Sequence, residues 1–254
     1  MMKDPLRYAR RTLLAATALF FATAMSCQAS VTIMGSRIIY ASTASSVDVQ
    51  LKNSDSFPYV VQTWFDAGDV NARPQDSNAV PFIATPPIFR IQPKAGQVVR
   101  IVFSKSKALP QDRESVYWFN ALQFPPSNLG GDRPQNKMLV VLRTRIKLFY
   151  RPASLGVPGA LVKKLQIKAV RDAKKGAGVE ITNPTPWFAS VSNLSTRVNG
   201  VSQNLTADMV APFASQTFWF TGKASAPQGN GSVKVTLVND QGARMSESYD
   251  VVWR

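Results

Sequence analysis

The sequence predicts an all-β protein made of two small sandwich domains. From Val31 onward, short runs rich in β-branched and aromatic residues alternate with turn clusters, at the spacing typical of antiparallel sandwiches. The same region shows no convincing helical period in its apolar residues. A break rich in proline and glycine at 151–159 separates the strands into two groups. These three observations favour two β domains with few helices.

Residues 1–29 have the pattern of a cleaved signal peptide. Basic residues precede the apolar run 13–25, which is too short to span a bilayer. Small residues around Ala29 fit signal-peptidase cleavage, so we expect an exported mature chain. Lipid attachment at Cys27 is the weaker alternative, because Met25 fits a lipobox poorly.

Composition excludes several classes of chemistry. Histidine is absent, which argues against metal sites and against Ser-His or Cys-His catalysis. The single Cys lies in the predicted signal peptide, so the mature chain would have no disulfide. No Gly-rich loop with the required Lys is visible, so we expect no nucleotide or other cofactor. No second long apolar segment follows, and we expect no stable membrane insertion.

The net charge is strongly basic but does not identify a partner. It is +15 for the whole chain, and falls to about +12 without residues 1–29, which carry four basic residues and one acidic residue. A secreted basic protein can bind nucleic acid, acidic polysaccharide, lipid headgroups or an acidic protein. Charge alone does not choose among them.

Six strands are expected in the first domain, which we place at 30–151. They are separated by turn clusters rich in Asn, Asp, Gly, Pro and Ser. The expected strands are 31–40, 46–52, 59–65, 98–103, 116–122 and 138–150.

The strand at 138–150 is apolar on both faces at its start and basic toward its end. Period-two geometry places Met138, Val140 and Leu142 on one face. It places Leu139 and Val141 on the other. Such a strand is either central in a parallel sheet or lies at an edge and requires an outside partner.

The second domain, at 152–254, is expected to be another sandwich. The dipeptide Asn199-Gly200 predicts a tight hairpin turn, and 239–242 predicts a second turn. The expected strands are 162–170, 179–182, 187–194, 216–220, 233–238 and 246–253.

Four segments carry a resemblance to a known family. They are ATPPIFR at 84–90, LPQDRESVYWFN at 109–120, IKLFYRP at 146–152 and NPTPWF at 183–188. In this order they resemble the periplasmic chaperones of the chaperone–usher pilus pathway, the PapD-like family. The resemblance implies two immunoglobulin-like sandwiches arranged as an L with a cleft between them. It also implies a non-enzymatic periplasmic protein that binds, folds and caps pilus subunits by donor-strand complementation and delivers them to an outer-membrane usher.

The resemblance also implies roles for individual residues. Met138, Val140 and Leu142 would insert into the subunit, while Leu139 and Val141 would anchor the strand to its own domain. Arg37 and Lys147 would clamp the carboxylate at the subunit's C-terminus. Interdomain ion pairs would be made by Glu114, Arg151 and Asp240. The short connection at 124–135 resembles the short-loop subfamily.

Other functions remain open from the residues alone. The chain could be a pilus subunit or adhesin, although it carries a full set of expected strands. It could be a glycosidase using Asp66, Asp69 or Asp112, although nothing in the sequence brings two of these acids together. It could bind an acidic polysaccharide. Self-association of the unliganded chaperone is a further expectation, and nucleic-acid binding is not expected.

Overall fold

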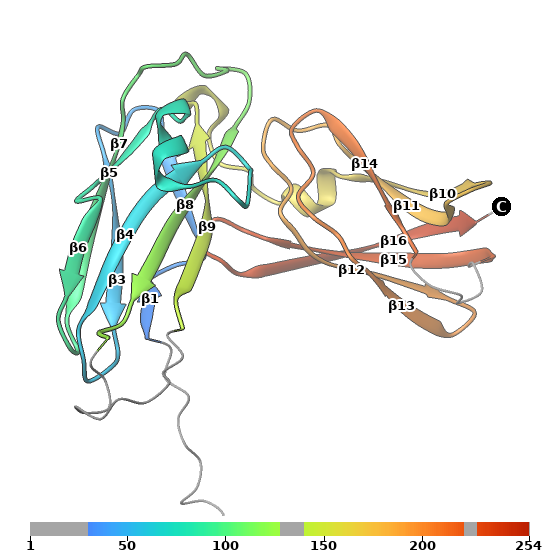
Figure 1. Ribbon diagram of the computed structural model, residues 1–254. Coiled ribbons are helices and arrows are strands. Elements are labelled where there is room, and N and C mark those ends of the chain that lie inside the picture. Colours follow the sequence, from blue (N-terminus) through green and yellow to red (C-terminus); the bar gives the residue numbers. More distant parts are fainter. Residues whose placement is uncertain (1–29, 128–139, 221–227, 254) are drawn as a thin grey trace, which may run out of the picture.

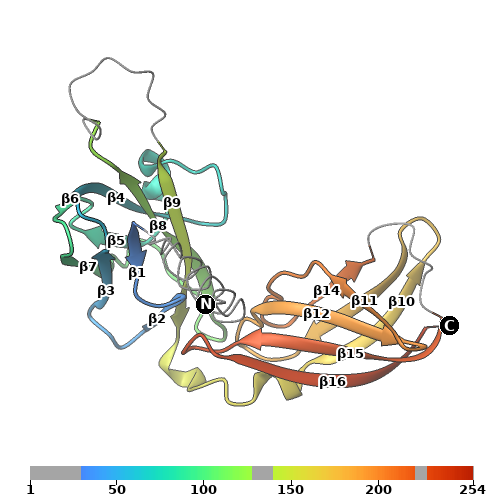
Figure 2. The ribbon, with the colours of Figure 1, turned by 90° about the horizontal axis from the view of Figure 1, so that it is seen from below.

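The computed structural model describes residues 30–127, 140–220 and 228–253 (Figure 1). Two β-sandwiches lie at an angle to one another and form an L (Figure 1). The segment that follows β9 joins them, as the view from below shows (Figure 2). The predicted signal peptide, Met138 and Leu139 lie outside the described residues. Among the described residues, no helix is both long and apolar enough to cross a bilayer.

Two sheets build the first sandwich. One has the order β1-β3-β7-β5, and the other has the order β2-β9-β8-β4-β6. The strands of the first sheet are β1 (Val31–Ile33), β3 (Val47–Asn53), β7 (Gly96–Phe103) and β5 (Phe82–Thr85). Those of the second are β2 (Arg37–Ala41), β9 (Leu142–Arg151), β8 (Ser115–Phe124), β4 (Tyr59–Asp66) and β6 (Ile88–Ile91). A 3-10 helix, η1 (Pro74–Ala79), follows β4.

Aromatic side chains fill the centre of this sandwich. Phe82 is fully buried, and its ring centroid lies 5.2 Å from that of Tyr117 and 5.4 Å from that of Tyr40. Phe65, Phe103 and Tyr150 also pack against Phe82. Large rings in offset and edge contacts bury much apolar surface, so the two sheets are held together without a disulfide.

The second sandwich also has two sheets, with orders β10-β11-β14 and β13-β12-β15-β16. The strands of the first are β10 (Gln166–Asp172), β11 (Gly176–Asn183) and β14 (Ala214–Trp219). Those of the second are β13 (Val201–Leu205), β12 (Val191–Val198), β15 (Gly229–Val238) and β16 (Arg244–Trp253). Two 3-10 helices, η2 (Ala153–Leu155) and η3 (Leu161–Lys164), precede them. Alternating aliphatic residues of facing strands, including Val179, Leu194 and Val233, form the core.

The structure confirms the all-β prediction of two sandwiches. It also confirms the turn at Asn199-Gly200, where both residues have positive φ (49° and 79°) and connect β12 to β13. β9 ends at Arg151 and β10 begins at Gln166. The domain limits 30–151 and 152–254 stay a prediction.

Several strand boundaries differ from the prediction. The expected strand 31–40 is divided at Gly35, whose φ of 109° redirects the chain, so that β1 and β2 lie in different sheets. The expected strand 162–170 begins instead with η3, and the expected strand 187–194 begins only at Val191. β5 and β6 were not predicted, because they are short and prolines at 81, 86 and 87 interrupt their alternation. The Thr85-Pro86 bond between them is cis.

Candidate functional site

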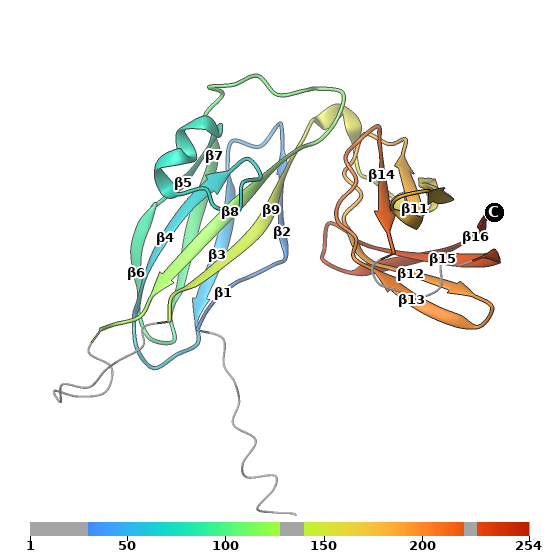
Figure 3. The ribbon, with the colours of Figure 1, turned by 45° about the vertical axis from the view of Figure 1, so that its right-hand side comes forward.

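One edge of β9 is open along half its length. β8 pairs with β9 from Leu142 to Tyr150, whereas β2 pairs with the opposite edge only from Lys147 onward. Figure 3 shows β8, β9 and β2 side by side in this order. In the part of the chain that the structure describes, no strand pairs with that second edge over 142–146. Unpaired N–H and C=O groups of an exposed edge are a template for another strand.

The apolar residues at the start of this segment are exposed. Val140 is 59% exposed and Leu142 is 48% exposed, and β9 begins at Leu142 rather than at Met138 as predicted. Strand alternation places Leu142 on the face of the buried Leu148 and Tyr150. At the open edge, the exposed side chain of Leu142 therefore lies on the same face of the sheet as the core of the first sandwich.

The expectation that Val141 anchors the strand to its own domain is wrong. Val141 is 38% exposed and lies before β9, outside the core cluster of the first sandwich. By alternation it belongs to the face that carries Arg143 and Arg145, which is not the core face. Met138 and Leu139 lie outside the described residues, so their predicted roles stay predictions.

Arg37 and Lys147 meet where the open edge ends. They are register partners on the parallel strands β2 and β9. Arg37 Nη1 donates to the carbonyl oxygen of Val238 in the second sandwich at 2.8 Å. Arg37 Nε is buried and finds no hydrogen-bond partner among the described residues. Lys147 Nζ lies 3.6 Å from Asp208 Oδ1, also in the second sandwich.

Both cations are partly buried, and burial disfavours their charged forms. It lowers the pKa of Arg37, although the charges of Asp240 and Glu114 oppose the shift. Burial also lowers the pKa of Lys147, Asp208 opposes the shift, and the positive charge of Arg37 lowers the pKa further. Two neighbouring and partly desolvated cations favour the approach of an anion.

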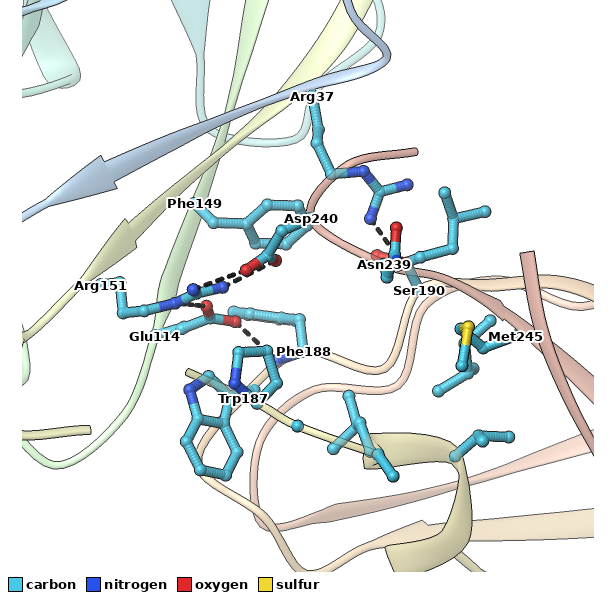
Figure 4. Close-up of a pocket in the computed structure, with 17 residues that line it drawn as sticks. Arg37, Glu114, Phe149, Arg151, Trp187, Phe188, Ser190, Asn239, Asp240 and Met245 are labelled. Atoms are coloured by element: carbon cyan, nitrogen blue, oxygen red, sulfur yellow. Dashed lines mark hydrogen bonds and ion pairs between the residues drawn. The ribbon is translucent and has the colours of Figure 1, made fainter. Parts of the chain in front are cut away.

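Arg151, Glu114 and Asp240 form the predicted contact between the sandwiches. Arg151 Nε donates to Glu114 Oε1 at 2.7 Å. Its two terminal nitrogens donate to the carboxylate of Asp240 at 2.7 and 2.9 Å (Figure 4). Glu114 Oε2 accepts a hydrogen bond from the backbone N–H of Phe188 at 2.8 Å. The network therefore joins the residue before β8 and the last residue of β9 to two loops of the second sandwich.

Charge and packing act together in this network. Burial would lower the pKa of Arg151, but its hydrogen bonds to Asp240 and the charge of Glu114 raise it overall. Phe149 packs against Phe188 with ring centroids 5.8 Å apart, next to the ion pairs. The bidentate geometry fixes direction as well as distance, so we expect this network to hold the angle between the sandwiches.

A second ionic cluster, not predicted from the sequence, joins β4, β8 and β9. The side chain of Asp66 is fully buried and accepts hydrogen bonds from Arg145 Nε at 2.9 Å and from Asn120 Nδ2 at 2.8 Å. The guanidinium of Arg145 also lies 4.6 Å from the Trp118 ring. The sequence contained one indication of this cluster: Arg143 and Arg145 are two residues apart and therefore share one face of a strand. Their partners on other strands could not be read from it.

The three acids considered for glycosidase chemistry have other contacts. Asp66 accepts hydrogen bonds from Arg145 and Asn120. Asp69 accepts from the backbone N–H of Asn71 at 2.8 Å. Asp112 forms an exposed ion pair with the neighbouring Arg113. Among the described residues, no hydrogen bond or ion pair joins any two of these acids. Across the described segments, no cluster of three or more His, Cys, Asp or Glu residues could hold a metal ion.

The fold and the site define a two-domain β-sandwich protein that presents an open strand edge beside a pair of cations in the cleft. The chain belongs to the PapD family of pilus-assembly chaperones. The model "Pili and flagellar-assembly chaperone, PapD N-terminal domain" matches residues 30–156. The model "Pili assembly chaperone PapD, C-terminal domain" matches residues 160–249. The predicted family is therefore confirmed, and the chain is a chaperone of fimbrial assembly.

Individual relatives agree with this assignment. The chain is 39% identical to the probable fimbrial chaperone YadV of Escherichia coli K12, over 89% of this chain and 93% of that protein. It is 38% identical to the chaperone protein HifB of Haemophilus influenzae, over 92% and 94% of the two chains. The crystal structure of the YadV chaperone superposes with a TM-score of 0.71 at 34% identity, over 87% of this chain and 100% of that chain.

A more distant structure shares the fold. A chain of the Salmonella enterica SafA pilin complex with the SafB chaperone superposes with a TM-score of 0.69 at 23% identity. The match covers 90% of this chain and 99% of that chain. At this identity, the likeness supports the two-sandwich architecture alone.

Proposed function

We propose that this chaperone binds, folds and caps pilus subunits by adding its β9 edge to the subunit's incomplete sandwich. One observation carries the proposal: the open edge at 142–146 ends at Arg37 and Lys147. The unpaired backbone groups of the edge can pair with a strand of the subunit, and the two cations can bind the carboxylate at the C-terminus of that strand. Addition of a strand to an exposed sheet edge is an established mode of pilin recognition by chaperones.

The geometry sets the direction of the subunit strand. β2 already pairs with β9 in parallel from Lys147 onward. An incoming strand on the same edge would therefore pair with residues 142–146, just before the stretch of β9 that β2 occupies. If its C-terminal carboxylate rests at Lys147, the rest of that strand runs back along 142–146. It is then parallel to β9, in line with β2. Backbone hydrogen bonds depend little on sequence, so one chaperone can serve several subunits.

Apolar side chains would supply the second part of the affinity. Val140 and Leu142 are exposed in the free protein and would be covered by the subunit. Met138 is proposed as a third insertion, although it lies outside the described residues. Each well-buried aliphatic side chain contributes about 1.5–3 kcal/mol.

The cation pair would recognise the terminal carboxylate. Arg37 Nε is a buried donor with no acceptor among the described residues, and Lys147 lies beside it in register. A carboxylate would supply that acceptor and relieve the repulsion between the two cations. Arg37 also bonds to Val238, so the clamp would depend on the second sandwich for its orientation.

The cellular setting follows from the family. A periplasmic location is implied for a fimbrial chaperone. We propose that residues 1–29 direct export and are removed after Ala29, and that the subunit is passed to an outer-membrane usher. We also propose that the chaperone is not an enzyme, uses no cofactor, binds no nucleic acid and serves a short-loop pilus system. Self-association through the exposed β9 edge is proposed for the unliganded protein.

A peptide comparison tests the clamp. A synthetic peptide with alternating apolar residues and a free C-terminal carboxylate is expected to bind at least about tenfold more tightly than its C-terminally amidated twin, because amidation removes the charge-assisted bonds. Titration calorimetry at fixed salt measures both affinities. Equal affinity for the two peptides, with binding that collapses uniformly as salt rises, would instead support a polysaccharide-type electrostatic binder.

A further inference from the structure

We propose that Asp208 is an internal competitor that occupies Lys147 until the subunit's carboxylate replaces it. The inference rests on the proposed clamp and adds a residue that sets how strongly the clamp selects a carboxylate. Asp208 Oδ1 lies 3.6 Å from Lys147 Nζ, across the cleft from the first sandwich. It is thus a carboxylate already placed at one of the two cations.

The loop that carries Asp208 is held in place. It connects β13 to β14, and two backbone hydrogen bonds of 2.9 Å between Ala189 and Val210 fix its centre. Val210 is fully buried, and Asn183 Nδ2 donates to the carbonyl oxygen of Ala211 at 3.1 Å. The carboxylate of Asp208 is therefore presented from a fixed backbone.

Asp208 itself can be displaced at low cost. Its side chain is 82% exposed, whereas that of Lys147 is 28% exposed. The backbone N–H of Met209 donates to Asp208 Oδ1 at 2.6 Å, so the carboxylate keeps a partner when it leaves the lysine. An exposed ion pair contributes less than a desolvated, charge-assisted clamp would provide. A subunit's terminal carboxylate can therefore replace it.

The pairing is selective for one of the two cations. Burial lowers the pKa of Lys147, and Asp208 opposes that shift only in part. The carboxylates that oppose the lowering of the Arg37 pKa by burial are instead Asp240 and Glu114. Arg37 keeps its buried Nε without a partner among the described residues. Asp208 thus offsets part of the positive charge at Lys147 and leaves Arg37 ready for the incoming anion.

The substitution Asp208→Asn tests the inference. Asparagine keeps the side-chain oxygen that accepts from Met209, but it removes the negative charge. The variant is expected to bind the free-carboxylate peptide about two- to fivefold more tightly than the wild type at low salt, and to bind the amidated peptide as the wild type does. The gain is expected to shrink at high salt. Asp250→Asn is the matched control, because Asp250 is an exposed acid on β16 of the same sandwich.

The outcomes separate the inference from the function on which it rests. A preference of the wild type for the free carboxylate, without a gain in Asp208→Asn, overturns the competitor role and leaves the clamp intact. An equal gain in Asp250→Asn, or for the amidated peptide, also overturns it, because the effect would then be one of net charge. No preference of the wild type for the free carboxylate overturns both.

Discussion

Replacing Lys147 by alanine is expected to weaken binding of a subunit peptide with a free C-terminus by about 2–5 kcal/mol, which is at least about thirtyfold in Kd. The lysine is largely covered and lies in register with Arg37 at the end of the open edge. In the complex, its loss would leave a desolvated carboxylate with a single cation. Titration calorimetry or fluorescence anisotropy at low micromolar protein measures the change.

A matched variant controls for charge. Lys168→Ala removes an exposed lysine on the outer face of β10, paired in register with Glu180. It is expected to change the affinity by less than about twofold, since exposed ion pairs contribute little. Arg37→Ala should resemble Lys147→Ala. If Lys147→Ala binds as tightly as Lys168→Ala, the lysine has no role in holding the carboxylate.

The second large effect is expected at the joint between the sandwiches. Arg151→Ala should lower the free energy of unfolding by about 3–5 kcal/mol, because it leaves the buried Glu114 without its cation. It should also weaken peptide binding, since Asp240 would no longer be tied to the first sandwich. Urea denaturation followed by tryptophan fluorescence reports the loss of stability.

Arg100→Ala is the control for this prediction. Arg100 pairs with Asp48 at 3.0 Å, but both side chains are well exposed, at 61% and 45%. The expected loss is small, because an exposed ion pair contributes little to stability. A loss of similar size in Arg151→Ala and Arg100→Ala would show that the interdomain network contributes no more than a surface ion pair.

Most of the residues proposed to act between the sandwiches could be predicted, because they lie within recognisable segments. Lys147 and Arg151 fall in the motif IKLFYRP at 146–152, and Glu114 falls in the motif at 109–120. The structure brings Arg151, Glu114 and Asp240 together, as predicted, although Asp240 is distant in sequence. Arg37 lies in register with Lys147.

Other features could not be predicted, because they depend on tertiary placement. Asp208 lies in a loop without a recognisable motif, and only the angle between the sandwiches brings it near Lys147. The family resemblance implied that Val141 anchors the strand to its own domain, but Val141 is exposed, and alternation from Leu148 places it on the face opposite the core. The division of 31–40 depends on the conformation of Gly35, which a run of β-forming residues conceals.

The central claim is that a subunit strand pairs with the open edge of β9. Hydrogen–deuterium exchange of the backbone amides in 142–146, measured on the free chaperone and on its complex with a purified subunit, tests it most directly. We expect fast exchange at the amides facing away from β8 in the free protein, and strong protection in the complex. We also expect no change along the free edge of β16. Equal exchange of 142–146 in the free and bound chaperone would contradict the claim.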